Sequence, residues 1–165
     1  MKSILSFLLI TSSLFMIYSC KPEVKVNLNN TADAANEITY DSTLAKKLGA
    51  DEYGMKHYVM AFLKRGPQRD QDSITAAEIQ KGHMANINSL AEEGKLVVAG
   101  PFEDDGEIRG IFIFNVATLE EAQALTSTDP AVQSGRLIME LHPWYGSAAL
   151  MEVNSLHGKL SKKSF

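Results

Sequence analysis

The stretch KHYVMAFLKR, residues 56–65, decides the fold that this sequence predicts. Its composition predicts a β-strand, which Gly66-Pro67 ends. Because side chains alternate along a strand, apolar residues occupy both of its faces. One face carries Val59, Ala61 and Leu63, and the other carries Tyr58, Met60 and Phe62. Apolar residues on both faces are typical of a central strand that is covered on both sides.

The following residues predict two helices and three further strands. Apolar residues at helical spacing predict a helix over residues 75–93, which ends at Gly94. A second helix is expected over residues 120–126, with Thr118 as its N-cap and Glu121 completing a capping box. The strands are expected at residues 95–99 (KLVVA), 108–116 (IRGIFIFNV) and 137–141 (LIMEL).

This order of elements predicts an α+β fold. It corresponds to a ferredoxin-like βαββαβ unit, with a four-stranded antiparallel sheet and two helices on one face. The first and third strands, which are apolar on both faces, would be central, and the second and fourth would be edges. The fourth strand alternates: Leu137, Met139 and Leu141 face inward, and Arg136, Glu140 and His142 face the other way.

The sheet face without helices would expose large apolar side chains. It would combine Tyr58, Met60 and Phe62 with either Phe112, Phe114 and Val116 or the alternate residues of that strand. Burial of each large apolar side chain stabilises by about 1.5–3 kcal/mol. We therefore expect a homodimer whose two sheets pack face to face. Helical spacing in residues 147–160 offers an alternative cover for part of this face.

The two ends of the chain lie outside the predicted domain of residues 55–146. Residues 1–20 are typical of a lipoprotein signal peptide, in which Cys20, the single cysteine, receives the lipid; a plain secretory signal is the alternative. Residues 21–54 predict a polar tether with a short helix near residues 42–50. Residues 147–165 predict a C-terminal helix and a basic tail. We expect a protein that is lipid-anchored to a membrane of the bacterial cell envelope and does not span it.

Composition excludes several classes of function. The net charge is −4 and no basic stripe is present, which argues against nucleic-acid binding. A single cysteine cannot form an internal disulfide, and His57, His142 and His157 show no metal-ligand spacing with any carboxylate. The sequence has no phosphate loop, no nucleophile elbow and no dinucleotide fingerprint, so we expect neither a metal nor a cofactor.

One histidine interrupts the apolar stripe of the first predicted helix. His83 lies midway between Ile79 and Ile87, on the face that should be buried. Histidine is suited to proton transfer because its titration falls close to neutral pH. Two interpretations remain open from periodicity alone: a proton-transfer residue, or a core histidine satisfied by one hydrogen bond.

The ordered motifs resemble the YCII-related (YciI-like) family over residues 55–146. They are the helix histidine, GKLVVAGP (94–101), DDG (104–106), GIFIF (110–114), EEA (120–122), Asp129-Pro130, Gly135 and HPW (142–144). The family is similar in fold to the dimeric α+β barrel proteins. The resemblance implies an active site that pairs His83 with Asp129. It also implies lyase-type proton abstraction and elimination on small cyclic or aromatic compounds, without a cofactor.

Each candidate site residue also has a structural interpretation. An Asp followed by Pro is a favourable helix start, so Asp129 is either an N-cap or the carboxylate that orients His83, or both. Arg65 and Arg136 would stabilise a bound anion, or would form surface salt bridges. Tyr58 and His142 would contact substrate, or would belong to the core or the dimer contact. The alternative functions are a non-catalytic small-ligand-binding or structural module, and haem binding.

Overall fold

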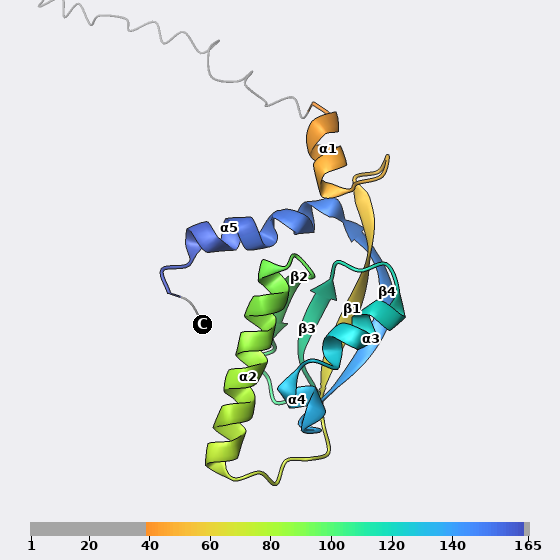
Figure 1. The fold of residues 1–165 in the computed structure, drawn as a ribbon. Helices are drawn as coiled ribbons and strands as arrows, with labels where there is room; N and C mark the ends of the chain where they lie inside the picture. Colours follow the sequence, from red (N-terminus) through yellow and green to blue (C-terminus); the bar gives the residue numbers. More distant parts are fainter. Residues whose placement is uncertain (1–38, 164–165) are drawn as a thin grey trace, which may run out of the picture. The chain divides into compact units, whose positions relative to one another are not determined.

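The computed structural model describes residues 39–163. A four-stranded antiparallel sheet forms its centre, in the order β2-β3-β1-β4 (Figure 1). The strands are β1 (Met55–Arg65), β2 (Leu96–Pro101), β3 (Ile108–Phe114) and β4 (Leu137–Ser147). The α+β fold is confirmed, as are the central positions of the first and third strands. The strands that are apolar on both faces are therefore the ones with a neighbour on each side.

The fourth strand is longer than the sequence predicted. It continues past residue 141 to Ser147, which pairs with Met55, so that β4 follows β1 along the whole of its length. Pro143 lies within it, opposite Val59. Proline is tolerated there because β4 is an edge strand, where a missing N–H need not break the sheet.

Two helices cover one face of the sheet, and the capping signals predicted at Gly94 and Thr118 are confirmed, whereas the first helix begins two residues earlier than predicted. Helix α2 (Ser73–Glu92) begins after the N-cap Asp72. It ends before Gly94, whose φ of 69° is the left-handed conformation that glycine adopts at low cost. Helix α3 (Leu119–Thr126) begins at a capping box formed by Thr118 and Glu121, as predicted. The four-residue helix α4 (Pro130–Gln133) follows, with Asp129 as its N-cap.

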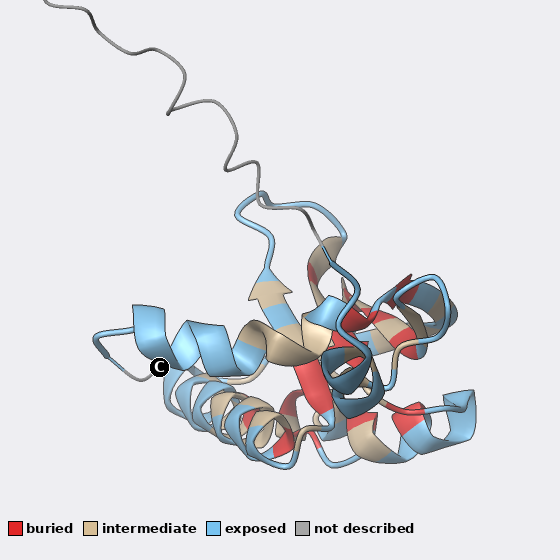
Figure 2. Cartoon of the chain, turned by 90° about the horizontal axis from the view of Figure 1, so that it is seen from above, coloured by how far each residue is buried: buried red, intermediate tan, exposed pale blue. Residues whose placement is uncertain are grey.

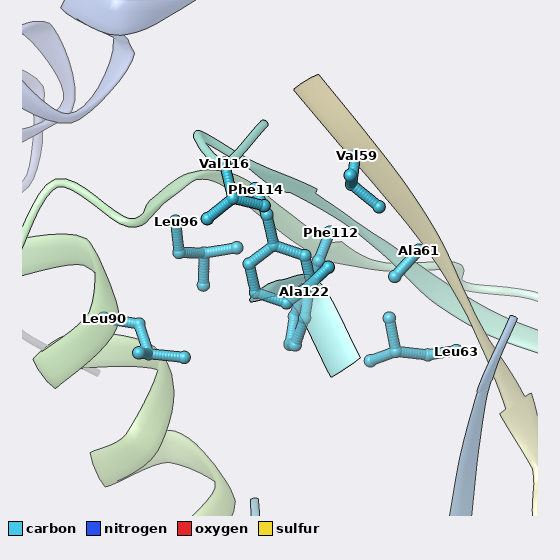
Figure 3. Packing of buried hydrophobic residues seen from close by; sticks show 9 residues of the cluster. All are labelled: Val59, Ala61, Leu63, Leu90, Leu96, Phe112, Phe114, Val116 and Ala122. Atoms are coloured by element: carbon cyan, nitrogen blue, oxygen red, sulfur yellow. The ribbon is translucent and has the colours of Figure 1, made fainter. Parts of the chain in front are cut away.

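The main core lies between the sheet and these helices (Figure 3). Leu90 of α2 and Ala122 of α3 pack there against the sheet. The strand residues of this cluster are Val59, Ala61, Leu63, Leu96, Phe112 and Phe114, with Val116 just beyond β3. The sequence left open which alternate side chains of the third strand face the helices. Phe112, Phe114 and Val116 lie on the helix-covered face. Leu137, Met139 and Leu141 also pack on this cluster, as predicted.

The opposite face of the sheet is only partly covered. Tyr58, Val97 and Ile113 are buried there beneath Leu150 and Met151 of the 3₁₀ helix η2 (Ala148–Glu152). Helix α5 (Val153–Leu160) then continues across the end of the sheet beside β2 (Figure 1). The C-terminal segment thus covers one end of this face. Met60, Phe62 and Ile111 remain half-buried, and Ile138 is 50% exposed. Figure 2 shows buried residues concentrated on the strands, with exposed residues along the outer sides of the helices.

The expected short helix before the domain is present. Helix α1 (Ser42–Leu48) is capped by Asp41 and ends at Gly49, whose φ is 71°. Lys47 bridges to Glu152 of η2 at 2.8 Å. The signal peptide, Cys20 and the tether up to residue 38 lie outside the described residues. Within residues 39–163, no helix has the length and apolar character needed to cross a membrane.

Candidate functional site

His83 and Asp129 form a direct pair in the interior. The Nδ1 atom of His83 lies 2.7 Å from Oδ2 of Asp129, a normal hydrogen-bond distance. Asp129 is completely buried and His83 is 8% exposed. The residues are separated by 46 positions in the sequence, so the packing of α4 against α2 brings them together.

Asp129 also caps helix α4. Its second carboxylate oxygen, Oδ1, accepts the backbone N–H of Ala131 at 2.8 Å, while Oδ2 contacts His83. Pro130 occupies the first position of α4, where its missing N–H leaves no donor unsatisfied. Asp129 therefore makes both of the contacts that its two interpretations require. The cap holds the carboxylate rigid, which fixes the direction of the contact with His83.

A glycine allows the two helices to approach this closely. A Cβ atom on Gly82 would lie 2.9 Å from Cγ of Pro130, well inside normal contact distance. Asn86, one turn further along α2, donates from Nδ2 to Oγ1 of Thr128 at 2.7 Å. These two contacts flank His83 and hold the residues around Asp129 against the helix.

The contact with Asp129 bears on the tautomer of the imidazole. An ionised carboxylate only accepts hydrogen bonds, so with Asp129 ionised the proton of this hydrogen bond belongs to Nδ1 of His83. In the neutral ring, the lone pair is then on Nε2. Nε2 has no hydrogen-bond partner among the described residues. Every fully buried side-chain nitrogen or oxygen of these residues does have a partner, so Nε2 is not fully buried. Nε2 is therefore the ring nitrogen accessible to a molecule in the adjoining cavity.

A cavity of about 640 Å³ adjoins the ring. It runs between α2 and the strands β2 and β3, and α5 contributes Val153, Asn154 and His157 to its wall. Apolar side chains form most of the surface near His83, including Ile79, Met84, Ile87 and Phe112. The ring of Phe112 stacks on His83, with centroids 6.0 Å apart and an interplanar angle of 17°. This volume is in the range that holds small organic molecules.

The other predicted site residues divide between the two faces of the sheet. Arg136 lines the cavity with His83, whereas Arg65 is exposed outside it. Tyr58 and His142 lie on the opposite face, so the structure does not bring them to this cavity. The Tyr58 hydroxyl donates to the carbonyl of Ser147, and burial raises the pKa of this phenol. His142 pairs with Glu140 at 2.9 Å.

Two of the arginines that line the cavity were not predicted from the sequence. Arg69 belongs to the loop between β1 and α2, and Arg109 lies at a register shift in β3 that leaves it without a partner on β1. A β-bulge re-aims a side chain relative to the regular alternation of the strand. Neither position carries a periodic signal, so sequence reasoning had no means of finding them. Among the described residues, no group of three His, Cys, Asp or Glu side chains could hold a metal ion.

Comparisons with known proteins place the chain in a family. No curated protein sequence matches it significantly. Among the solved structures that match is the 5-chloro-2-hydroxyhydroquinone dehydrochlorinase of Burkholderia phenoliruptrix AC1100 in complex with 2,5-dihydroxybenzoquinone, with a TM-score of 0.40 and 16% sequence identity. The match covers 52% of this chain and 92% of that chain. The sequence model of the YCII-related domain matches residues 58–145, which is more than half of the chain. The chain therefore belongs to the YCII-related domain family.

Proposed function

We propose that this protein is a cofactor-independent acid/base enzyme that acts on a small cyclic or aromatic compound. His83 would serve as the general base, and Asp129 would orient it. The reaction class is the lyase-type abstraction and elimination that the family resemblance implies. The observation that carries the proposal is the buried His83–Asp129 hydrogen bond, at 2.7 Å, beside a cavity of about 640 Å³.

The geometry supports proton transfer through one atom. A substrate in the cavity would present a C–H bond to Nε2 of His83, which takes the proton as Nδ1–H continues to donate to Asp129. The electron pair of that bond forms a new double bond within the substrate, and the leaving group departs with its own pair. The imidazolium then releases the proton. Asp129 stabilises the imidazolium by its charge and keeps the ring in the orientation that presents Nε2.

The experiment is an activity screen with matched variants. The full chain is incubated with small cyclic acids and halogenated phenols, and loss of substrate and release of the leaving group are measured. Asp129→Asn is the sharpest variant, since its amide can still accept from Ala131 but would donate to Nδ1. That reverses the tautomer and places the proton on Nε2. We expect both Asp129→Asn and His83→Gln to lower the rate by roughly 10²–10⁴-fold.

His142→Gln provides the matched control, because His142 also contacts a carboxylate but lies on the other face of the sheet. It should leave the rate unchanged. Equal losses in His83→Gln and His142→Gln would contradict the proposal. Turnover that survives in Asp129→Asn would do the same. If no compound in the screen is turned over but some bind, the alternative of a non-catalytic ligand-binding module is favoured.

We also propose that two copies associate through the partly open sheet face. Met60, Phe62 and Ile111 are half-buried there in the single chain, and Ile138 is 50% exposed. Ile138→Asp should convert a dimer to a monomer in light scattering after size-exclusion chromatography. Ile74→Asp makes the same chemical change at an exposed residue of α2 and should leave the dimer intact. A wild-type monomer would refute the association.

Attachment to the cell envelope is a separate proposal, supported by the sequence of residues 1–20. Cys20→Ser should abolish incorporation of a labelled fatty acid in bacteria and move the protein from the membrane to the soluble fraction. Lipid labelling that persists in Cys20→Ser would contradict it.

A further inference from the structure

The charges around the cavity are of one sign. Arg69, Arg109 and Arg136 line it, and no aspartate or glutamate does so. This local excess of positive charge contrasts with the whole chain, in which 20 acidic residues outnumber 16 basic ones. Three guanidinium groups close to one cavity repel each other, so their placement is favourable chiefly when an anion is bound between them.

The arginines are held in place but keep donors available. The Nη1 group of Arg69 donates to the carbonyl of Arg136, and Nη1 of Arg136 donates to Oε1 of Gln71. Arg109 uses Nη1 for two backbone carbonyls of the preceding turn, at Asp104 and Gly106. A guanidinium has five N–H donors, so each side chain is oriented by one nitrogen while the others remain available.

Carboxylates do not neutralise this group. Among the described residues, the single ion pair of these arginines is between Arg109 and the exposed Asp105, at a long 3.8 Å. Partial burial lowers the pKa of Arg69, and the positive charges of Arg136, Arg65 and Arg109 lower it further. The charges are therefore close enough to act on one another without a compensating carboxylate.

We infer that the cavity binds a planar ring that carries a carboxylate, with the carboxylate on Arg69, Arg109 and Arg136 and the ring between α2 and the sheet. Guanidinium groups match the two oxygens of a carboxylate in plane and charge. The apolar walls formed by Ile79, Met84 and Phe112 suit a ring and would be poor partners for a purely inorganic anion. The inference deepens the proposed function, because it names the charge class of the substrate at the same site.

Benzoate is the probe, and its neutral isostere benzamide is the comparison. Binding to the full chain is measured by calorimetry and by the perturbation of amide signals in NMR spectra. We expect benzoate to bind at least about tenfold more tightly than benzamide, as a charge-assisted hydrogen bond allows. Inorganic phosphate should bind more weakly than benzoate, because it makes no use of the apolar walls. Raising the salt concentration should weaken benzoate binding.

Variants assign the effect to the lining arginines. Arg69→Gln and Arg136→Gln should each weaken benzoate binding by about tenfold or more, with little change for benzamide. Arg65→Gln is the matched control, since Arg65 adds charge nearby but does not line the cavity. It should change the affinity by less than about threefold. This measurement reports binding alone, so it is independent of whether the protein is an enzyme.

Several results would overturn the inference. They are the absence of benzoate binding at millimolar concentration, equal affinities for benzoate and benzamide, and equal effects of Arg65→Gln and Arg136→Gln. Phosphate binding as tight as benzoate binding would reveal a general anion site instead. If benzoate binds as expected but no turnover is found for any compound, the inference stands and the proposed catalysis fails.

Discussion

A histidine lies beside a carboxylate on each side of the sheet, and the two pairs differ in almost every other respect. On the helix-covered face, the side chains of His83 and Asp129 are 10% and 0% exposed. On the opposite face, His142 and Glu140 are 49% and 48% exposed. The distances are similar, 2.7 Å and 2.9 Å. The chemical groups alone therefore do not distinguish the pairs; their surroundings do.

The pairs also arise in different ways. His142 and Glu140 are two residues apart on one strand, so simple alternation places both on the same side. His83 and Asp129 meet through the contact between α2 and α4, which Gly82 and Asn86 support. The contact between His142 and Glu140 can form within a single strand, whereas the contact between His83 and Asp129 forms only when the protein is folded. The surroundings of a buried pair hold it in a fixed orientation, and a proton-transfer site beside a cavity requires this.

The largest difference should appear in stability. Asp129→Ala removes a helix cap, which costs about 0.5–2 kcal/mol, and leaves Nδ1 of His83 unpaired in the interior, which costs about 1–3 kcal/mol. We expect the free energy of unfolding, measured with urea, to fall by roughly 2–4 kcal/mol. Glu140→Ala should have only a small effect, because Glu140 and its partners His142 and Lys64 are all accessible to solvent. Equal losses in the two variants would show that burial does not separate the pairs.

A second prediction concerns the approach of α4 to α2. Gly82→Ala places a Cβ 2.9 Å from the Pro130 ring, and relief of such overpacking typically costs about 1–3 kcal/mol. The higher helix propensity of alanine offsets about 1 kcal/mol of this. We expect a net loss of up to about 2 kcal/mol. The downfield NMR signal of the His83 Nδ1 proton should also move upfield as its hydrogen bond to Asp129 lengthens.

Gly158→Ala is the control for this variant. Gly158 is also helical, in α5, and a Cβ there would meet nothing within 4 Å. It should therefore be neutral or stabilising by up to about 1 kcal/mol. A Gly82→Ala protein as stable as Gly158→Ala, with an unchanged proton signal, would mean that the contact with Pro130 does not position Asp129.

The sequence predicted the fold because the strongest signals were local. The strand of residues 56–65 is apolar on both faces, and this alone indicated a central position. The capping box of Thr118 and Glu121 indicated a helix start from two residues. The length of β4 was missed because Pro143 and Gly146 are typical of a strand end. Their tolerance depends on β4 being an edge strand, which is a property of the whole sheet.

The candidate site was only partly predictable, because local patterns reveal single residues but not the contacts that the fold creates between distant segments. His83 was found because it interrupts an apolar stripe, which is a local pattern. Asp129 was assigned to it through the family resemblance, since no spacing rule connects positions 46 residues apart. Arg69 and Arg109 were missed because one lies in a loop and the other at a strand irregularity. Tyr58 and His142 were proposed as substrate contacts together with Arg65 and Arg136, but the alternation of the strands places Tyr58 and His142 on the far face.

The smallest expected effect concerns the response of the exposed pair to pH and salt. The hydrogen bond from His142, followed by the hydrogen bond and then the charge of Lys64, lowers the pKa of Glu140. A carboxylate with a lowered pKa contributes stability above its unfolded pKa, about 4.3 for Glu, and loses it as the pH falls through the folded pKa. The difference in stability between the wild type and Glu140→Gln should therefore be small at pH 7 and vanish in acid.

The effect of salt on stability should distinguish the two histidine–carboxylate pairs most directly. At about 1 M salt the Debye length is about 3 Å, so exposed charges barely interact. The contribution of Glu140 should then disappear at pH 7, while the loss caused by Asp129→Ala should persist, because that pair is shielded from ions by the protein. Urea unfolding of both variants at low and high salt measures this. If high salt also removed the effect of Asp129→Ala, the His83–Asp129 pair would be accessible to ions and its isolation from solvent would be refuted.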